Sequence, residues 1–395
     1  MSFEKTLDSG SVLYGKASAV ASYTLSTDAY DFENTGRATL EEAYLGFRTT
    51  ISNGLSFDVS LGPRELKLGT GMLIANGGSS GFERGALKFG PRKAWEMAAI
   101  GRVSGGGWTG TAFYIDPNER PASDGKNELA GLDVRYDAPE SGFLGATYVK
   151  VLNSESPYIR AAAGGAGAPT VLPGARDGTN ALSLYAKTSP LSGALENWVF
   201  AGDFAYEWNE AIDLEAWAGR VQVGYTFAGL SWSPTLTYSY QTFSGDDPNT
   251  TTLERFDPLF YEGSPSAWAT GSKSSMVFIN SNVQSHGLAL RMQPTKKDTL
   301  TLRYAHIRAN ELLSPIQFGQ ATRVDTTGGT ANVISGVTNA HLSDDLFLEY
   351  NRIINRNTFL TAGVSISFPG KGIRDTVVGD VPNWTGGFIN VVVNF

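Results

Sequence analysis

Apolar and polar residues alternate along most of the chain with a period of two. From Leu360 to Phe368 every second residue is apolar, and the residues between them are small or polar. The segments Leu129–Tyr136, Val221–Phe227 and Leu236–Gln241 repeat this pattern. Successive side chains of a β-strand point to opposite faces, so this period indicates strands with one apolar and one polar face. No stretch has a comparable period of 3.6 residues, and we predict an all-β fold.

Most of the predicted strands are about ten to fifteen residues long. They are expected near residues 11–24, 38–51, 55–70, 85–103, 107–116, 127–137, 142–152, 178–187, 197–208, 214–227, 231–243, 282–292, 298–311, 341–354, 358–368 and 383–395. A tilted strand needs ~9–11 residues to cross a bilayer, whereas strands of soluble proteins average ~5–6. The lengths predict a transmembrane antiparallel β-barrel of about 16 strands. Eighteen strands are the alternative, because Pro63 and Pro91 interrupt the pattern between 55 and 103.

The connections between these segments alternate in length. Ser52–Gly54, Ala138–Ser141 and Asn355–Asn357 are tight turns rich in Gly, Asn and Pro. Longer loops are expected near 25–37, 71–84, 117–126, 153–177, 244–281, 312–340 and 369–382. Outer-membrane barrels have short periplasmic turns and long extracellular loops. The connection near 209–213 is short where this scheme expects a long loop. We expect residues 1–395 to form a single outer-membrane β-barrel domain.

Composition excludes several classes of protein. The 395 residues include 31 Lys+Arg, 39 Asp+Glu, three His and no Cys, with a net charge of −8. Without Cys there are no disulfides and no thiolate-bound metal, and the three His have no metal-binding spacing, so we expect no metal and no cofactor. An acidic chain without a basic run does not favour nucleic-acid binding. The first residues lack a signal-peptide pattern, which fits a cytoplasmic protein or an exported one whose signal peptide has been removed; the strand pattern favours removal.

Charged residues occupy the polar faces of the predicted strands. In a membrane barrel the apolar face meets lipid and the polar face lines the lumen. The alternative is a soluble sandwich with a solvated charged face, in which about sixteen strands would bury their apolar faces against one another. Trp and Tyr near strand ends favour the barrel, because interfacial girdles use these residues. The lumen and selectivity candidates are Arg48, Arg135, Arg220, Arg291, Arg303, Glu42, Asp58, Asp133, Asp203, Glu207, Asp345 and Glu349.

The last residues carry a second membrane signal. Phe395 ends the chain, and Ile389, Val391 and Val393 precede it at alternate positions. This pattern is similar to the terminal signal by which outer-membrane proteins are recognised by their assembly machinery. The alternative is an ordinary edge strand of a soluble sheet. We expect Phe395 to be the assembly signal.

The loop from Ser244 to Ser281 combines carboxylates with aromatic rings. We expect it either to fold into the mouth as a constriction that contacts sugars or to pack on itself as a solvated extracellular loop. Two adjacent Asp residues without a ligand-spaced loop do not predict a calcium site. The constriction candidates are Asp246, Asp247, Glu254, Arg255, Asp257, Phe260 and Tyr261.

Three segments, Leu68–Trp95, Ser244–Pro248 and Glu254–Phe260, resemble the alginate export family of bacterial outer-membrane β-barrel porins. The resemblance implies a monomeric barrel in a Gram-negative outer membrane, in contact with lipid and lipopolysaccharide, through which a polymer or small solute crosses. The exporters that give the family its name use an arginine-rich lumen for an anionic uronate polysaccharide. Here seven candidate carboxylates accompany five arginines, so the resemblance supports the architecture more than the substrate.

These observations together predict an outer-membrane channel for a hydrophilic solute, with a carbohydrate or a uronate-type anion as candidates. One alternative is an outer-membrane barrel hydrolase, since His286 follows Ser285 and His306 is expected on a neighbouring strand. Both His residues are in phase with lipid-facing residues, and no Gly-x-Ser-x-Gly motif is present, so we predict no enzyme and no catalytic residues. The other alternative is a structural or adhesive barrel without transport.

Overall fold

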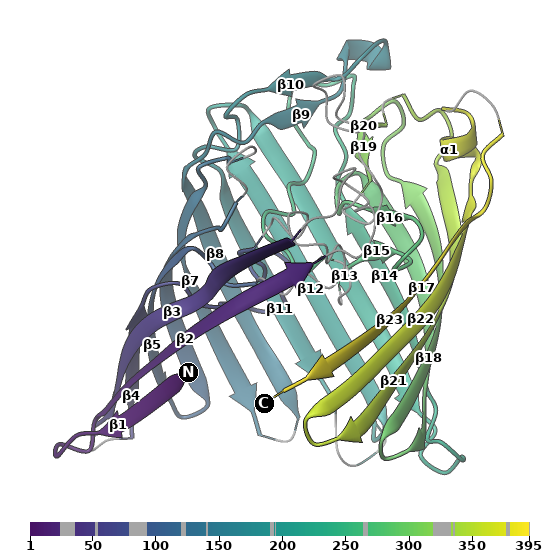
Figure 1. Ribbon diagram of the computed structural model, residues 1–395. Helices are drawn as coiled ribbons and strands as arrows, with labels where there is room; N and C mark the ends of the chain where they lie inside the picture. Colours follow the sequence, from purple (N-terminus) through teal and green to yellow (C-terminus); the bar gives the residue numbers. More distant parts are fainter. Residues whose placement is uncertain are drawn as a thin grey trace.

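One antiparallel sheet of 17 strands dominates the structure, a computed structural model (Figure 1). The described residues are 1–23, 36–51, 54–78, 93–119, 124–139, 141–189, 193, 195–263, 268–318, 333–334, 336–376 and 380–394. Each strand pairs with its neighbours along the chain, as in a meander. The strands are β1 (Ser2–Thr6), β2 (Val12–Tyr23), β3 (Gly36–Thr50), β4 (Ser56–Leu61), β5 (Met97–Gly105), β6 (Trp108–Asp116), β7 (Glu128–Ala138), β8 (Gly142–Asn153), β11 (Asn180–Thr188), β12 (Trp198–Asn209), β13 (Leu214–Thr226), β14 (Thr235–Phe243), β17 (Val283–Thr295), β18 (Asp298–Ala309), β21 (His341–Asn355), β22 (Thr358–Pro369) and β23 (Trp384–Val393).

Each of the sixteen predicted segments overlaps one strand of this sheet, and β1 is the additional strand. β1 pairs with β2 from Ser2 opposite Lys16 to Thr6 opposite Val12. The segment predicted over 55–70 is too long, because β4 ends at Leu61. Gly62 follows it with a φ of 119° and Pro63 has no backbone N–H, so the ladder stops there. The beginning of the segment predicted over 85–103 lies outside the described residues.

The connections are short at one end of the sheet and long at the other, apart from residues 210–213 between β12 and β13. Figure 1 shows β9, β10 and α1 at the long-loop end. The described chain has no helix long and apolar enough to cross a membrane. The small elements are β9 (Tyr158–Arg160), the 3₁₀ turn Ala163–Gly165, β10 (Thr170–Leu172), β15 (Thr270–Gly271), β16 (Val277–Phe278), β19 (Ile316–Gln317), β20 (Val333–Ile334) and α1 (Lys371–Arg374).

The two faces of the sheet are inverted relative to a soluble protein. On the outer face large apolar side chains are exposed, for example Leu132 at 57% and Val364 at 60%. On the inner face charged side chains are buried, for example Asp133 at 5% and Glu349 at 6%. Water does not favour such a distribution, whereas a bilayer around a polar interior does. The sheet is therefore built to face lipid.

Aromatic pairs lie near both ends of the strands on the outer face. At the short-turn end the rings of Trp198 and Tyr225 are 5.0 Å apart, and at the long-loop end those of Tyr206 and Trp208 are 5.9 Å apart. Trp198 and Trp208 stand about ten residues apart on β12, which at ~3.3 Å per residue and a tilt of ~40° is roughly 25 Å across the membrane. This spacing matches the height of a lipid-facing apolar band flanked by aromatic girdles.

The sheet curls so that its first and last strands come round toward the same side (Figure 1). Within the part of the chain that is described, β23 pairs with β22 and has no pairing with β1 or β2. β1 already occupies the edge of β2 from Val12 to Lys16. Closure into a single barrel domain, and a strand number of 16 or 18, stay predictions.

Candidate lumen constriction

Two long connections fold against the inner face of the sheet and join each other there. They are the 62–78 segment after β4 and the 244–282 segment after β14, the latter described at 244–263 and 268–282. The Phe260 N–H donates to the Leu73 carbonyl and the Ala75 N–H donates to the Phe260 carbonyl, both at 2.9 Å. The Glu262 N–H donates to the Gly71 carbonyl at 2.8 Å. The two segments therefore form one inner body.

Aromatic side chains make the core of this inner body. The Trp95 indole is fully buried, donates to the Leu66 carbonyl at 3.1 Å and packs edge-on against Phe260. The Trp268 indole is also fully buried; it donates to the Thr70 carbonyl at 3.0 Å and packs against Phe243. Buried Trp residues with satisfied N–H groups fix packing geometry. The described part of the loop lies against the inner face of the sheet.

The wall formed by β12 and β13 holds this body through buried charges. The Arg220 guanidinium donates to the Asp203 carboxylate at 3.1 and 3.3 Å and lies 3.5 Å from the Trp268 ring centre. Thr70 donates a further hydrogen bond to Asp203. Glu207, four residues further along β12 on the same face, accepts the Asp257 backbone N–H at 2.8 Å. Asp203 and Glu207, two of the carboxylates predicted for the lumen, thus hold segments that fold against the inner face.

The opposite wall, β21 and β22, holds the tip of the β15–β16 hairpin, residues 272–276. The Ser272 N–H donates to Asp345 at 2.8 Å, and the Lys273 ammonium contacts Glu349 at 2.7 Å. Ser275 shares a hydrogen bond of 2.7 Å with Ser367. Burial lowers the pKa of Lys273 below 10.5, although the hydrogen bond and charge of Glu349 act in the opposite direction. Asp345 and Glu349 are therefore also attachment points for a loop.

The other predicted lumen carboxylates bind groups on the adjacent strand or on the strand beyond it. Glu42 is paired with Lys16, and Asp58 accepts the Tyr14 hydroxyl at 2.6 Å. Asp133 accepts the Thr147 hydroxyl at 2.6 Å and the Tyr185 hydroxyl at 2.9 Å. These contacts hold the wall itself.

The five predicted arginines do not form one ladder. Arg48 contacts Glu4 at 2.6 Å and Arg135 contacts Asp137 at 2.6 Å, both partly exposed. Arg220 is committed to Asp203. Arg303 lies 3.5 Å from Glu349 and is 41% exposed, whereas Arg291 is exposed and has no ion pair among the described residues.

Among the constriction candidates, Asp246 is buried, whereas Asp247 and Glu254 lie on a turn. Asp246 is buried and accepts the N–H groups of Ala161 at 2.6 Å and Glu254 at 3.0 Å, and burial raises its pKa. Asp247 and Glu254 approach each other across the turn, with 3.4 Å between the Asp247 N–H nitrogen and a Glu254 oxygen. Asp246 and Asp247 therefore serve the turn backbone. Phe395 lies outside the described residues.

Arg255, Asp257 and Tyr261 border a small cavity of about 310 Å³. Arg176 makes two bonds to Asp257, at 2.6 and 3.0 Å, and Arg255 donates to Gln317 at 2.6 Å. Burial lowers the pKa of Arg255 and raises that of Tyr261 to about 12. The charged groups of Arg176, Arg255 and Asp257 therefore bond to other residues of the long connections.

A larger polar cavity of about 480 Å³ lies between the wall and the β15–β16 hairpin. Cations and a carboxylate border it, together with hydroxyl and amide side chains. Sequence reasoning missed Lys273 because a lone lysine in a Ser-rich loop carries no signal of which wall it reaches. Its polar lining includes Arg220, Lys273, Arg303, Asp345, Gln222, Ser239, Gln241 and Ser285.

Ser285 and His286 lie on opposite faces of β17. Ser285 is buried on the inner face, whereas His286 shares a hydrogen bond of 2.8 Å with the Tyr238 hydroxyl on the outer face. Adjacent residues of a strand cannot point to the same side. The side chains of Ser285 and His286, which suggested the hydrolase alternative, therefore lie on opposite sides of the sheet.

The inverted faces, the unequal ends and the charged inner side define the class of outer-membrane β-barrel transport proteins. The family model described as "Alginate export" matches residues 174–378, and the chain belongs to this family. The predicted resemblance is confirmed. The protein is thus an outer-membrane channel for transport in Gram-negative bacteria.

Among solved structures, a loop-deletion mutant of OmpT, an outer membrane protein of Vibrio cholerae, is 11% identical; the match covers 99% of this chain and 89% of that one with a TM-score of 0.40. A porin is 10% identical, covering 95% and 100%, with a TM-score of 0.39. An anion-selective porin from Comamonas acidovorans is 10% identical, covering 100% of both chains, with a TM-score of 0.31. No curated protein matches the chain. The assignment rests on the family model and on the faces of the sheet.

Proposed function

We propose that this channel passes a small hydroxylated solute that carries a carboxylate, such as a sugar acid of the uronate type, by passive diffusion. The carrying observation is the polar cavity of about 480 Å³ beside the β15–β16 hairpin. Gln222, Gln241 and Ser285 offer amide and hydroxyl groups to it. Such groups both donate and accept, which suits the hydroxyls of a sugar.

Arg303 is the group best suited to receive the carboxylate. Glu349 is already held by Lys273 at 2.7 Å, while Arg303 approaches it at 3.5 Å and is 41% exposed. A guanidinium that is loosely paired keeps N–H donors free for a bidentate bond to a carboxylate. Arg220 is less suited, because Asp203 and Trp268 already occupy its faces.

The size of the open space favours a small solute over a polymer. The inner body occupies the concave side of the sheet and is fixed to both walls. The cavity of about 480 Å³ beside the hairpin lies in the range of ordinary small-ligand sites, ~300–1,000 Å³. A polysaccharide needs a continuous path, which supports mono- or disaccharide units as the transported form.

The proposal includes a closed, single-domain barrel that works as a monomer in contact with lipopolysaccharide. It also includes recognition of the terminal Phe395 by the outer-membrane assembly machinery. Support comes from the curled sheet, the exposed apolar band and the alternating apolar residues of β23. A closed sheet leaves no unpaired edge in lipid, which is the physical reason to expect it.

The test is conductance of the purified channel in planar bilayers, with glucuronate and glucose added in turn. We expect discrete conductance steps and stronger block by glucuronate than by glucose. Arg303→Glu should weaken the glucuronate block about tenfold, since a hydrogen-bonded charge pair contributes ~1.5–3 kcal/mol. Arg356→Glu, an equal charge change in the short turn after β21, should leave the block unchanged.

Two outcomes contradict the proposal in different ways. Folded protein without conductance steps would support a structural or adhesive barrel. Equal block by both sugars, unchanged in Arg303→Glu, would refute the solute class while leaving the channel in place.

A further inference from the structure

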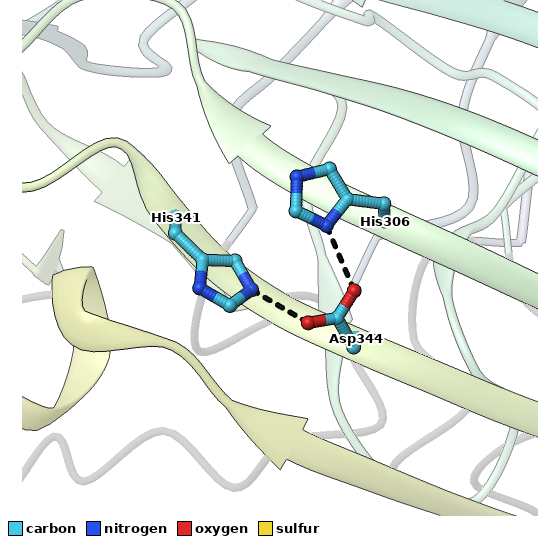
Figure 2. Close-up of side chains that lie close together, drawn as sticks. All are labelled: His306, His341 and Asp344. Carbon is cyan, nitrogen blue, oxygen red and sulfur yellow. Dashed lines mark hydrogen bonds and ion pairs between the residues drawn. The ribbon is translucent and has the colours of Figure 1, made fainter.

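Two of the three histidines meet on the outer face at the long-loop end of the sheet. His306 lies on β18, and His341 and Asp344 lie on the neighbouring strand β21 (Figure 2). Asp344 stands directly opposite His306 in the ladder. The register then shifts by one residue, so that Arg308 pairs with His341. This bulge turns His341 to the same face as Asp344, which a regular strand would not do.

The three side chains converge on one point, as Figure 2 shows. The His306 Nδ1 atom is 2.8 Å from one oxygen of Asp344, and the His341 Nε2 atom is 2.8 Å from the other. One ligand atom from each of the three residues lies within 4.8 Å of those of the other two. The two imidazoles are stacked, with ring centres 5.0 Å apart.

We propose that His306, His341 and Asp344 bind one divalent ion of the Zn²⁺ type. Two imidazole nitrogens and a carboxylate suit Zn²⁺, Ni²⁺ or Co²⁺, whereas Ca²⁺ and Mg²⁺ prefer oxygen ligands alone. Ligands at ~2.0–2.1 Å around a tetrahedral Zn²⁺ ion are about 3.3 Å apart. The observed N···O separations of 2.8 Å need only small ring movements to admit the ion.

A neighbouring hydroxyl holds the carboxylate in position. Tyr304 lies two residues before His306 on β18 and donates to Asp344 at 2.7 Å. Such an outer partner orients a carboxylate ligand and adds to metal affinity. Tyr304 is a positioning residue, because it acts through Asp344.

The location leaves the site open to solution and gives the ion a structural task. The three side chains are 30–33% exposed, on the long-loop side of the exposed apolar residues Leu302 and Leu346. Three protein ligands leave positions for water. β18 and β21 flank the connection 310–340, so a bound ion would fasten together the two ends of that loop.

His286 provides a matched control. It pairs with His306 from the next strand and lies on the same face, but its Nδ1 atom is bonded to the Tyr238 hydroxyl and not to a carboxylate. With no Cys and one further His in the chain, few other soft ligands compete for the ion.

The experiment is calorimetric titration of the untagged, detergent-solubilised full chain with Zn²⁺, Ni²⁺ and Ca²⁺. We expect one Zn²⁺ or Ni²⁺ per chain and no comparable binding of Ca²⁺. His306→Gln and His341→Gln should each weaken binding by roughly tenfold or more, and Tyr304→Phe by about tenfold. His286→Gln should bind like the unchanged protein. Heat-modified gel migration confirms that each variant is folded.

A second measurement covers variants that fail to fold. Zn²⁺ should raise the thermal unfolding temperature of the unchanged protein and of His286→Gln. Absence of binding and of this shift in the unchanged protein would overturn the proposal. So would binding that survives His306→Gln and His341→Gln together, or that is lost equally in His286→Gln.

Discussion

The inner face of the sheet carries similar charge pairs in two regions, and they are used differently. On β12 and β13 the Asp203–Arg220 pair is almost completely buried, because the inner body covers it. On β7 the Arg135–Asp137 pair lies near the short turns, and its aspartate is 53% exposed. Both regions show an arginine and a carboxylate on the polar face of a strand.

The difference shows that burial by a loop, and not the residue types, decides what a lumen charge does. A pair in water is screened and worth little, whereas a buried pair cannot lose one partner without leaving an uncompensated charge. Arg220 therefore attaches the loop to the wall. Arg303 is partly exposed and only loosely paired, so it keeps N–H donors available for a solute.

Removing one carboxylate from each region gives the largest expected contrast. Asp203→Ala removes the carboxylate to which the buried Arg220 guanidinium is bonded and should lower the free energy of unfolding by about 3–5 kcal/mol. Asp137→Ala should lower it by about 0–1 kcal/mol, since that pair is exposed. Urea unfolding in lipid vesicles, followed by Trp fluorescence, measures both. Equal losses of stability in the two variants would show that burial by the loop does not decide how much each pair contributes.

Shortening the hairpin tip tests whether the inner body limits transport. Replacing residues 272–276 by Gly-Gly removes the contacts to Asp345, Glu349 and Ser367 but keeps the Gly271–Val277 pairing closed by a two-residue turn. Single-channel conductance should rise about twofold, because conduction follows the width of the narrowest part of a pore. Replacement of the exposed short turn 296–297 by Gly-Gly is the control. An unchanged conductance in the tip variant would place the narrowest point elsewhere.

The smallest expected effect is a pH dependence from Lys273. Its pKa lies below 10.5, so its charge is lost at a lower pH in the folded channel than in the unfolded chain. Between these two pKa values the unfolded chain binds more protons, and the free energy of unfolding therefore rises with pH. Over the same range anion preference should fall as one positive charge disappears beside Glu349 and Arg303.

Reversal potentials in a salt gradient between pH 7 and 10.5 measure this fall. Lys273→Arg should abolish it, because the guanidinium stays protonated. A fall that persists in Lys273→Arg would assign the titration to another group.

The sheet could be predicted in detail because its cause is local. Alternation of apolar and polar residues sets each strand, and the sixteen predicted segments all fall on strands of the sheet. β1 was missed, since Ser2–Thr6 is short and charged and depends on pairing with β2. The early end of β4 also has a local signal, because Gly62 and Pro63 follow it.

The residue types on the inner face could be predicted, but the contacts that these residues make could not. The sequence placed Asp203, Glu207, Asp345 and Glu349 on the inner face, where they lie. It could not show that the Asp257 backbone, the Ser272 backbone and Lys273 would meet three of them. Those contacts join residues tens of positions apart, and no periodicity records them.

The histidines also show a contact that the sequence did not predict. Their separation along the chain argued against a metal site, because short-range spacing was the available criterion. A one-residue bulge in β21 turns His341 outward and brings it to Asp344 and His306. By itself the sequence determined which face of each strand meets lipid, because every second side chain shares a face. Only the tertiary structure decided which charges are buried and which ligands converge, because that depends on where loops fold and where the register slips.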